Sequence, residues 1–206
     1  MTANNNVTPI PLLVSSIRLV AVPTAVAVSR MFVRHTLEQW HFEEHIDVAT
    51  LIMSELATNA IKATGITSPQ PKSWQITDEH VVAMQLRALG ASLYVEVWDR
   101  SGGDPVRKNP DLEATNGRGL LLVDVLSKRR SIYRPPVGGK IVWAELPLGV
   151  PLESPPLKPV HRPLLLGPGI RAPRGPVENQ ARTALFDWLT KTTIDSELSS
   201  RVNDAT

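Results

Sequence analysis

Glu55 and Asn59 are the first pair of side chains whose types and spacing could support chemistry. They stand four residues apart in a segment with helical periodicity, so their side chains share one face of that helix. An asparagine carbonyl oxygen is a hard ligand that suits Mg²⁺. A carboxylate one turn away could take a proton from a hydroxyl group or from water. Taken alone, a Glu and an Asn at this spacing more often belong to an ordinary solvated helix.

Asp99 is the second candidate, because it ends an alternating apolar strand and precedes the loop Arg100-Ser101-Gly102-Gly103. A carboxylate in that place can accept a hydrogen bond from the amino group of a base. Such a charge-assisted bond contributes about 1.5–3 kcal/mol. That is enough to favour adenine over a base that offers an acceptor there. The alternative is a simple turn, since Asp and Gly both favour turns.

A third candidate is the segment Asn116-Gly117-Arg118-Gly119-Leu120, which leads directly into a predicted helix. Glycines at a helix start expose unpaired backbone N–H groups, and the helix dipole favours an anion there. The segment therefore suits a phosphate group. The alternative is that the glycines only cap the helix, because a lone Gly-x-Gly is weak evidence.

The elements that must position these residues follow from apolar periodicity and from turn signals. Helices are predicted over 23–40, 45–64 and 120–130, and strands over 16–22, 80–88, 92–98 and 140–146. Gly90 marks a hairpin between two of the strands, and residues 100–118 form a long polar loop. This order predicts an α/β sandwich, with a mixed, mainly antiparallel sheet and helices on one face.

Composition excludes several classes of function. The chain has 206 residues, of which 42% are hydrophobic and 20% charged, as in a soluble globular protein. The absence of cysteine excludes disulfides, thiolate catalysis and cysteine–zinc sites. A net charge of +2 and the lack of a basic, aromatic face argue against direct nucleic-acid binding. No segment has membrane-spanning length or signal-peptide pattern, so we expect a cytoplasmic protein that does not bind membranes.

Proline marks the end of the predicted domain, because eight of the 18 prolines fall between Pro151 and Pro176. We therefore divide the chain into a flexible N-terminus (1–14), a folded domain (15–148), a Pro-rich linker (149–176) and a tail with a short amphipathic helix (177–206). The favoured interpretation of the tail is a tether whose helix packs weakly. The alternative is a docking element in which Leu185, Phe186, Trp188 and Leu189 enter a partner's groove.

Together the three candidates form a more specific pattern than any of them alone. A helix with Glu-x-x-x-Asn, a strand that ends in Asp-x-Ser-Gly-Gly, and a loop leading to Gly-x-Gly and a helix resemble the N box and glycine boxes of the GHKL ATPase/kinase superfamily. The phrases 54–60 (Ser-Glu-Leu-Ala-Thr-Asn-Ala), 117–123 (Gly-Arg-Gly-Leu-Leu-Leu-Val) and 142–146 (Val-Trp-Ala-Glu-Leu) resemble the small bacterial ATP-binding regulators related to anti-sigma-factor serine kinases. The resemblance covers about residues 15–148.

The resemblance implies a Bergerat-type sandwich that binds ATP with Mg²⁺. It implies that Asp99 bonds the adenine amino group, that Asn59 ligates Mg²⁺ and that Glu55 is the base that activates the attacking hydroxyl. The segments that would line the base and phosphates contain Gly103, Gly117, Arg118, Gly119 and Leu120, with residues 104–116 as the ATP lid. Arg107 and Lys108 are further candidates for phosphate contact, although solvated lid charges explain these two better.

Four features depart from the family pattern: Ala63 replaces a common His, Ser101 replaces a Gly, Asn116 replaces a Gly, and Arg129-Arg130-Ser131 replaces Arg-Trp-Gly. None removes the implied Mg²⁺ ligand or adenine contact. Two hypotheses follow. In the first, the chain is a serine/threonine kinase that phosphorylates an antagonist protein, with a sigma factor as its other partner and a homodimer as its assembly. In the second, it is a non-catalytic, ATP-gated module that binds a partner protein.

Overall fold

A computed structural model describes residues 12–68, 71–77, 79–102, 119–152, 164–167, 170–172, 177 and 179–190. In chain order the main elements are β1 (Leu12–Val20), α1 (Thr24–Trp40), α2 (Ile46–Thr64), β2 (Val81–Leu89), β3 (Ser92–Asp99), α3 (Gly119–Leu126), β4 (Arg129–Tyr133) and β5 (Lys140–Pro147). Short 3-10 turns cover Glu43–His45 and Ser73–Gln75. A further helix, here called the C-terminal helix, covers residues 179–190.

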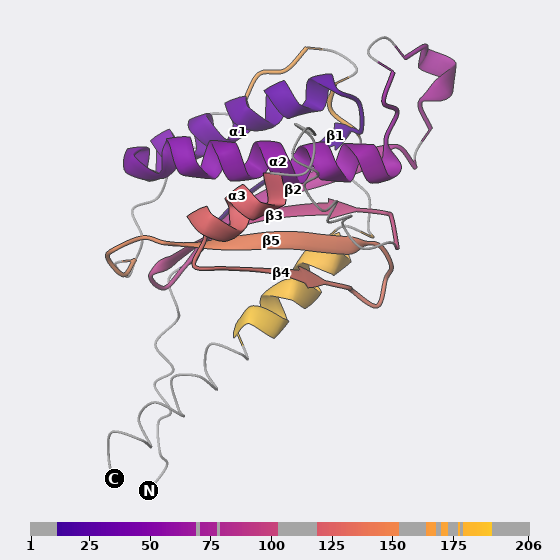
Figure 1. Cartoon of the computed structure of the whole chain (residues 1–206). Helices are drawn as coiled ribbons and strands as arrows, with labels where there is room; N and C mark the ends of the chain where they lie inside the picture. The colour runs from indigo at the N-terminus through magenta and orange to yellow at the C-terminus, as the bar shows by residue number, and fades with distance from the viewer. Residues whose placement is uncertain are drawn as a thin grey trace, which may run out of the picture.

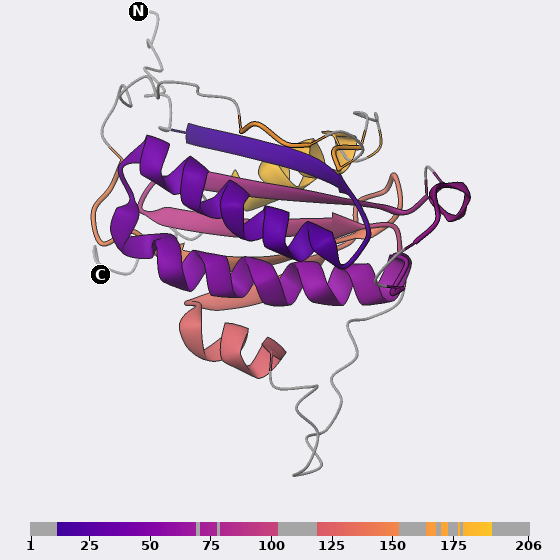
Figure 2. The ribbon, with the colours of Figure 1, turned by 90° about the horizontal axis from the view of Figure 1, so that it is seen from above.

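The five strands form one sheet in the order β1-β2-β3-β5-β4, and every neighbouring pair is antiparallel. Gly90, with φ of +59°, makes the predicted hairpin between β2 and β3. Figure 1 shows α1, α2 and α3 on one side of this sheet, which confirms the predicted α/β sandwich. Figure 2, seen from above, shows α1 and α2 lying side by side over the sheet and running roughly along its strands.

The main core lies between the sheet and α1 and α2. It consists of alternate residues of each strand together with the apolar stripes of both helices, because successive strand side chains point to opposite faces. Residues that represent its layers are Leu19, Phe32, Leu37, Ile52, Leu56, Met84, Leu86, Val95, Val97 and Ala144. Val95 and Val97 of β3 belong to this core, so the alternation places Asp99 on the α2 side of the sheet.

The structure confirms the two long predicted helices within a residue of each end. Pro23 precedes α1, where its fixed φ suits a helix start and its missing N–H costs nothing. His41 ends α1 in the left-handed conformation, with φ of +59°. Its N–H donates to Glu38, and that of Phe42 donates to Leu37, so carbonyls of the last turn are satisfied.

Two predicted boundaries are wrong. β1 begins at Leu12 and ends at Val20, rather than spanning 16–22, and it therefore enters the segment predicted as a flexible N-terminus. The predicted helix 120–130 ends at Leu126, and its last residues belong to β4. The physical reason is pairing with β5, because the β4 backbone joins that strand and Arg129 pairs with the buried Glu145 carboxylate.

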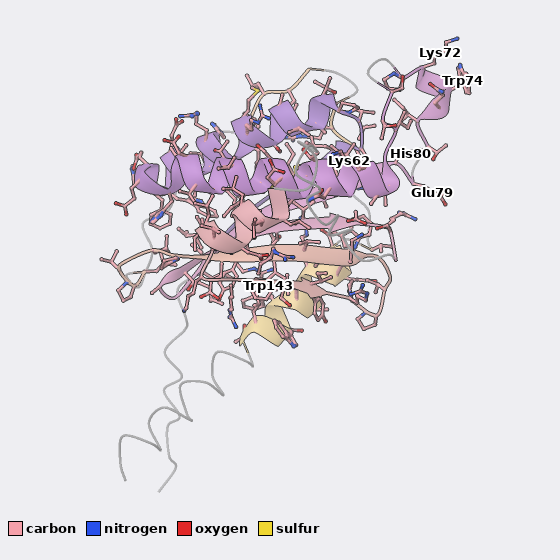
Figure 3. The ribbon with its side chains drawn as sticks, in the orientation of Figure 1. Lys62, Lys72, Trp74, Glu79, His80 and Trp143 are labelled. Carbon is pink, nitrogen blue, oxygen red and sulfur yellow. The ribbon has the colours of Figure 1, made fainter. Side chains whose placement is uncertain are left out.

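The C-terminal helix corrects the favoured interpretation of the tail. Its Ala181, Leu185 and Leu189 are fully buried against the second face of the sheet, so the helix is not weakly packed. Figure 3 labels Trp143, which points from β5 to the side where this helix lies. The Trp143 and Trp188 ring centroids are 6.0 Å apart. Within the described residues, helices therefore cover both faces of the sheet, with α1, α2 and α3 on one face and the C-terminal helix on the other.

The described parts of the predicted linker also contact the domain. Residues 170–172 lie along the outer edge of β1, where the Val20 N–H donates to Ile170 and the Ala172 N–H donates to Arg18. These bonds satisfy backbone groups that an edge strand would otherwise expose. None of the helices in the described part of the chain combines the length and apolar character that crossing a membrane requires.

Candidate functional site

Helix α2 presents Glu55 and Asn59 at the border of the core. Ile52 and Leu56 of the same helix are buried against the sheet, whereas Glu55 and Asn59 are each only partly buried. Within the described residues, neither polar side chain has a hydrogen-bond partner. Helical spacing thus places a carboxylate and an amide one turn apart, with oxygens available to a ligand.

The Glu55 carboxyl group lies directly against Gly119, the first residue of α3. A Cβ atom at position 119 would stand 2.7 Å from Glu55 Cδ and 3.3 Å from its Cγ, and it would overlap Oε2. Any side chain at this position would therefore push the carboxylate away, and glycine allows the close approach. The structure brings together two residues that the sequence placed in separate motifs.

Asp99 ends β3 on the same side of the sheet as α2. It follows Val95 and Val97 in the alternation, and both of those side chains lie in the main core with Ile52 and Leu56. The Asp99 side chain is 1% exposed. Its Oδ1 accepts a hydrogen bond from the Ser101 backbone N–H at 2.8 Å, as a carboxylate does when it opens a turn.

Lys140 is a site residue that sequence reasoning missed. It begins β5 directly opposite Asp99 in the antiparallel register, and its Nζ donates to Asp99 Oδ1 at 2.8 Å. The ammonium also donates to the Ser101 carbonyl at 3.4 Å and contacts the Ser101 hydroxyl. A lysine at the start of a mostly apolar strand was the available signal. Its partner depends on strand pairing that local sequence does not reveal.

The turn before Lys140 fixes this pair in place. Gly139 has φ of +75°, and a Cβ at this position would stand 2.8 Å from Trp98 Nε1 and would overlap the Asp99 carbonyl oxygen. The Trp98 Nε1–H donates to the Gly138 carbonyl at 3.4 Å. The end of β3 and the start of β5 are therefore held together by close backbone packing beside the buried pair.

Several predicted site residues lie outside the described residues, namely Gly103, Arg107, Lys108, Gly117 and Arg118, together with the predicted lid 104–116. Leu120 is described, and its side chain is buried in the main core. A nucleotide could therefore meet Leu120 only through its backbone.

The described oxygens of the site are those of Glu55, Asn59 and Asp99. No group of three or more His, Cys, Asp or Glu side chains that could hold a metal ion occurs in the part of the chain that the structure describes. A metal held by protein ligands alone therefore has no support here. A Mg²⁺ ion that takes most of its oxygens from phosphates and water needs only one or two protein ligands, and the Asn59 amide oxygen can be one of them.

Two carboxylates with shifted pKa values lie on the other face of the sheet, under the C-terminal helix. Burial raises the pKa of Glu96, although the Arg87 guanidinium and Gln85 oppose the shift. Burial also raises the pKa of Glu145, but hydrogen bonds from Ser92 and Arg129 outweigh it and leave this pKa below its ordinary value. Shifted pKa values often mark functional sites, but both groups are enclosed by protein partners.

Comparison with known proteins does not assign the chain to a family. No protein-family model matches the chain, and no curated protein matches it significantly. The functional argument therefore depends on the motifs and on the geometry that joins them.

Proposed function

We propose that this chain is an ATP-binding regulatory protein that acts as a serine/threonine kinase of the anti-sigma-factor type. The observation that carries the proposal is the approach of the Glu55 carboxylate to Gly119. A general base and the N-terminus of a helix, where phosphate binds, meet at one point. The Asp99 carboxylate on the same side of the sheet supplies a second anchor for the nucleotide.

The base would be recognised at the end of β3. Asp99 is buried and held by Ser101 and Lys140 through Oδ1 alone. Oδ2 accepts no hydrogen bond from any described residue, so it is the atom that would accept the adenine amino group. A charge-assisted bond of this kind contributes about 1.5–3 kcal/mol.

The phosphates would lie between α2 and the first turn of α3. Backbone N–H groups at a helix start attract phosphate, whereas the Glu55 carboxylate repels it. Mg²⁺ bound at Asn59 would offset that repulsion and neutralise charge on the phosphates. The amide oxygen of Asn59 suits this hard cation.

Phosphoryl transfer would use Glu55 as the base. The carboxylate would take the proton of a serine or threonine hydroxyl on the partner protein, and the hydroxyl oxygen would bond to the γ-phosphorus of ATP. The bond from that phosphorus to the bridging oxygen would break, and ADP would leave. The product would carry an added charge of about −2, which changes the partner's docking surface.

The exposed face of α3 favours a second candidate function, in which ATP gates partner binding without phosphoryl transfer. Leu121, Leu122 and Val125 are exposed on this helix, with Val125 at 75%. The first turn of the same helix lies at the proposed phosphate position. A nucleotide that bound there would also fix an apolar surface suited to a protein partner.

One experiment separates these functions. The full chain is incubated with γ-labelled ATP, Mg²⁺ and a candidate antagonist protein, and Glu55→Gln and Asn59→Ala variants are tested beside it. Label on a serine or threonine of the partner, lost in Glu55→Gln while ATP still binds, supports the kinase. ATP-dependent partner binding without label, unchanged in Glu55→Gln, supports the gated module. A folded chain that binds no ATP contradicts both.

A further inference from the structure

In the Asp99–Lys140 pair, one carboxylate oxygen of Asp99 is fully hydrogen-bonded and the other is not. Asp99 Oδ1 accepts two hydrogen bonds at 2.8 Å, one from the Ser101 N–H and one from Lys140 Nζ. A carboxylate has about four acceptor positions, two on each oxygen. Both positions of Oδ1 are therefore occupied by protein donors.

Lys140 has no donor to spare either. An ammonium group has three N–H donors, and the structure gives Nζ three acceptors: Asp99 Oδ1, the Ser101 carbonyl and the Ser101 hydroxyl. Lys140 is itself 2% exposed, so no water shell surrounds it. Of the two Asp99 oxygens, only Oδ2 is therefore left to accept a hydrogen bond from a ligand.

We infer that Lys140 is a specificity residue that makes the site select adenine nucleotides over guanine nucleotides by occupying Asp99 Oδ1. This inference rests on the proposed function and deepens it. Guanine presents two adjacent donors, N1–H and the C2 amino group, which pair with a carboxylate when both of its oxygens are free. Adenine presents one amino group beside a ring acceptor and needs one oxygen only.

Saturation of Oδ1 therefore removes the advantage that a free carboxylate would give to guanine. A guanine in this place would leave its second donor without a partner in a buried site, which costs affinity. Lys140 acts here through Asp99 and not by contact with the base, so it is a positioning residue.

The main test compares Lys140→Met with Lys140→Arg in the full chain. Calorimetric titrations with ADP and with GDP, both with Mg²⁺, give the ratio of the GDP to the ADP dissociation constant. Methionine fills the space without a donor and frees one acceptor position of Oδ1, while the Ser101 N–H keeps the other, so this ratio is expected to fall at least about tenfold. Arginine keeps a donor to Oδ1, so its ratio is expected to stay within about threefold of the unchanged protein.

Lys140→Met leaves Asp99 buried without its partner and can fail to fold. A second measurement therefore uses the unchanged protein alone. IDP lacks the C2 amino group of GDP and has only the N1–H donor. The unchanged protein should bind GDP at least about fivefold more weakly than IDP, since the C2 amino group of GDP would be buried without an acceptor on Asp99. An open carboxylate would instead bind GDP about tenfold more tightly.

The outcomes are distinct. A GDP affinity equal to or above that of IDP in the unchanged protein overturns the inference, and so does an unchanged ratio in folded Lys140→Met. Either result leaves ATP binding intact. No heat of binding with any nucleotide overturns the proposed function itself.

Discussion

Each face of the sheet buries an ion pair, and the two pairs are satisfied differently. On the face under the C-terminal helix, Arg87 binds both oxygens of Glu96, and Gln85 donates to the same carboxylate at 2.8 Å. On the face under α2, Lys140 and Ser101 both bind Oδ1 of Asp99. Glu96 is closed to ligands, whereas Asp99 keeps one oxygen for them.

The difference teaches how to distinguish a structural carboxylate from a binding one. Burial of a charge is costly unless hydrogen bonds and an opposite charge compensate it. Protein donors on both oxygens, as at Glu96, leave little for a ligand to gain. Partial compensation, as at Asp99, is a cost that a bound base can relieve.

The largest effect on stability should come from breaking the Arg87–Glu96 ion pair. Arg87→Met removes the guanidinium and leaves Glu96 buried without its partner, and the free energy of unfolding should fall by about 3–5 kcal/mol. Urea unfolding measures this loss. The double variant Arg87→Met/Glu96→Gln should regain much of it, because no unpaired charge remains. Equal losses in both variants would show that the charge of Glu96 is unimportant.

The C-terminal helix should matter nearly as much. Leu185 is fully buried on the second face, so Leu185→Ala should lower the free energy of unfolding by about 2–5 kcal/mol. Leu165→Ala is the matched control, since Leu165 is 87% exposed. If both variants had the same stability as the unchanged chain, the C-terminal helix would not contribute to the fold.

On the α2 face, the contact between Glu55 and Gly119 should affect chemistry more than stability. Gly119→Ala forces the carboxylate to turn away, and such a displacement can cost up to about 100-fold in transfer rate. The flexible Glu55 can move, so the unfolding midpoint should change little. Gly167→Ala, where a Cβ meets only ordinary contact distances, is the control. Full transfer activity in Gly119→Ala would contradict Glu55 as the base.

The smallest effect concerns acid stability on the second face. The pKa of Glu145 in the native state is lower than its ordinary pKa of 4.5, so the ionised carboxylate stabilises the native state at pH values above 4.5. This contribution is lost as the pH falls through the native pKa. Glu145→Gln should therefore be less stable than the unchanged chain at neutral pH, with the difference shrinking below pH 4.5. A difference independent of pH would show that the ionisation of Glu145 does not contribute.

The pKa of Glu96 is shifted in the opposite direction to that of Glu145, so its effect on stability has the opposite pH dependence. Its pKa is raised, so the native state binds its proton more tightly than the unfolded chain does. Its contribution to stability is present below pH 4.5 and is lost as the pH rises through the native value.

Local sequence predicted the elements that have strong periodicity. Both long helices and the strands β2, β3 and β5 follow from apolar spacing. Glu55 and Asn59 could be singled out because they lie at the core border of a helix, and Asp99 because it ends a strand. β4 was missed because Arg129-Arg130-Ser131 has no alternation that marks a strand.

The rest required long-range contacts. The burial of the C-terminal helix depends on the second face of the sheet, and its signal was the row of Tyr94, Trp98 and Trp143 on the strand positions opposite to the main core. Lys140 could be assigned to Asp99 only through the register of β3 and β5. Such pairings join residues that are far apart in sequence, and no local pattern encodes them.

The most direct test of the account is calorimetric titration of the full chain with ADP and Mg²⁺, with Asp99→Asn and Glu96→Gln beside it. Asparagine can keep its oxygen toward Lys140 and turn an NH₂ donor toward the base. We therefore expect Asp99→Asn to weaken binding about 10- to 100-fold and Glu96→Gln to leave it within about twofold. Absence of binding by the unchanged chain, or equal binding by Asp99→Asn, would contradict the account.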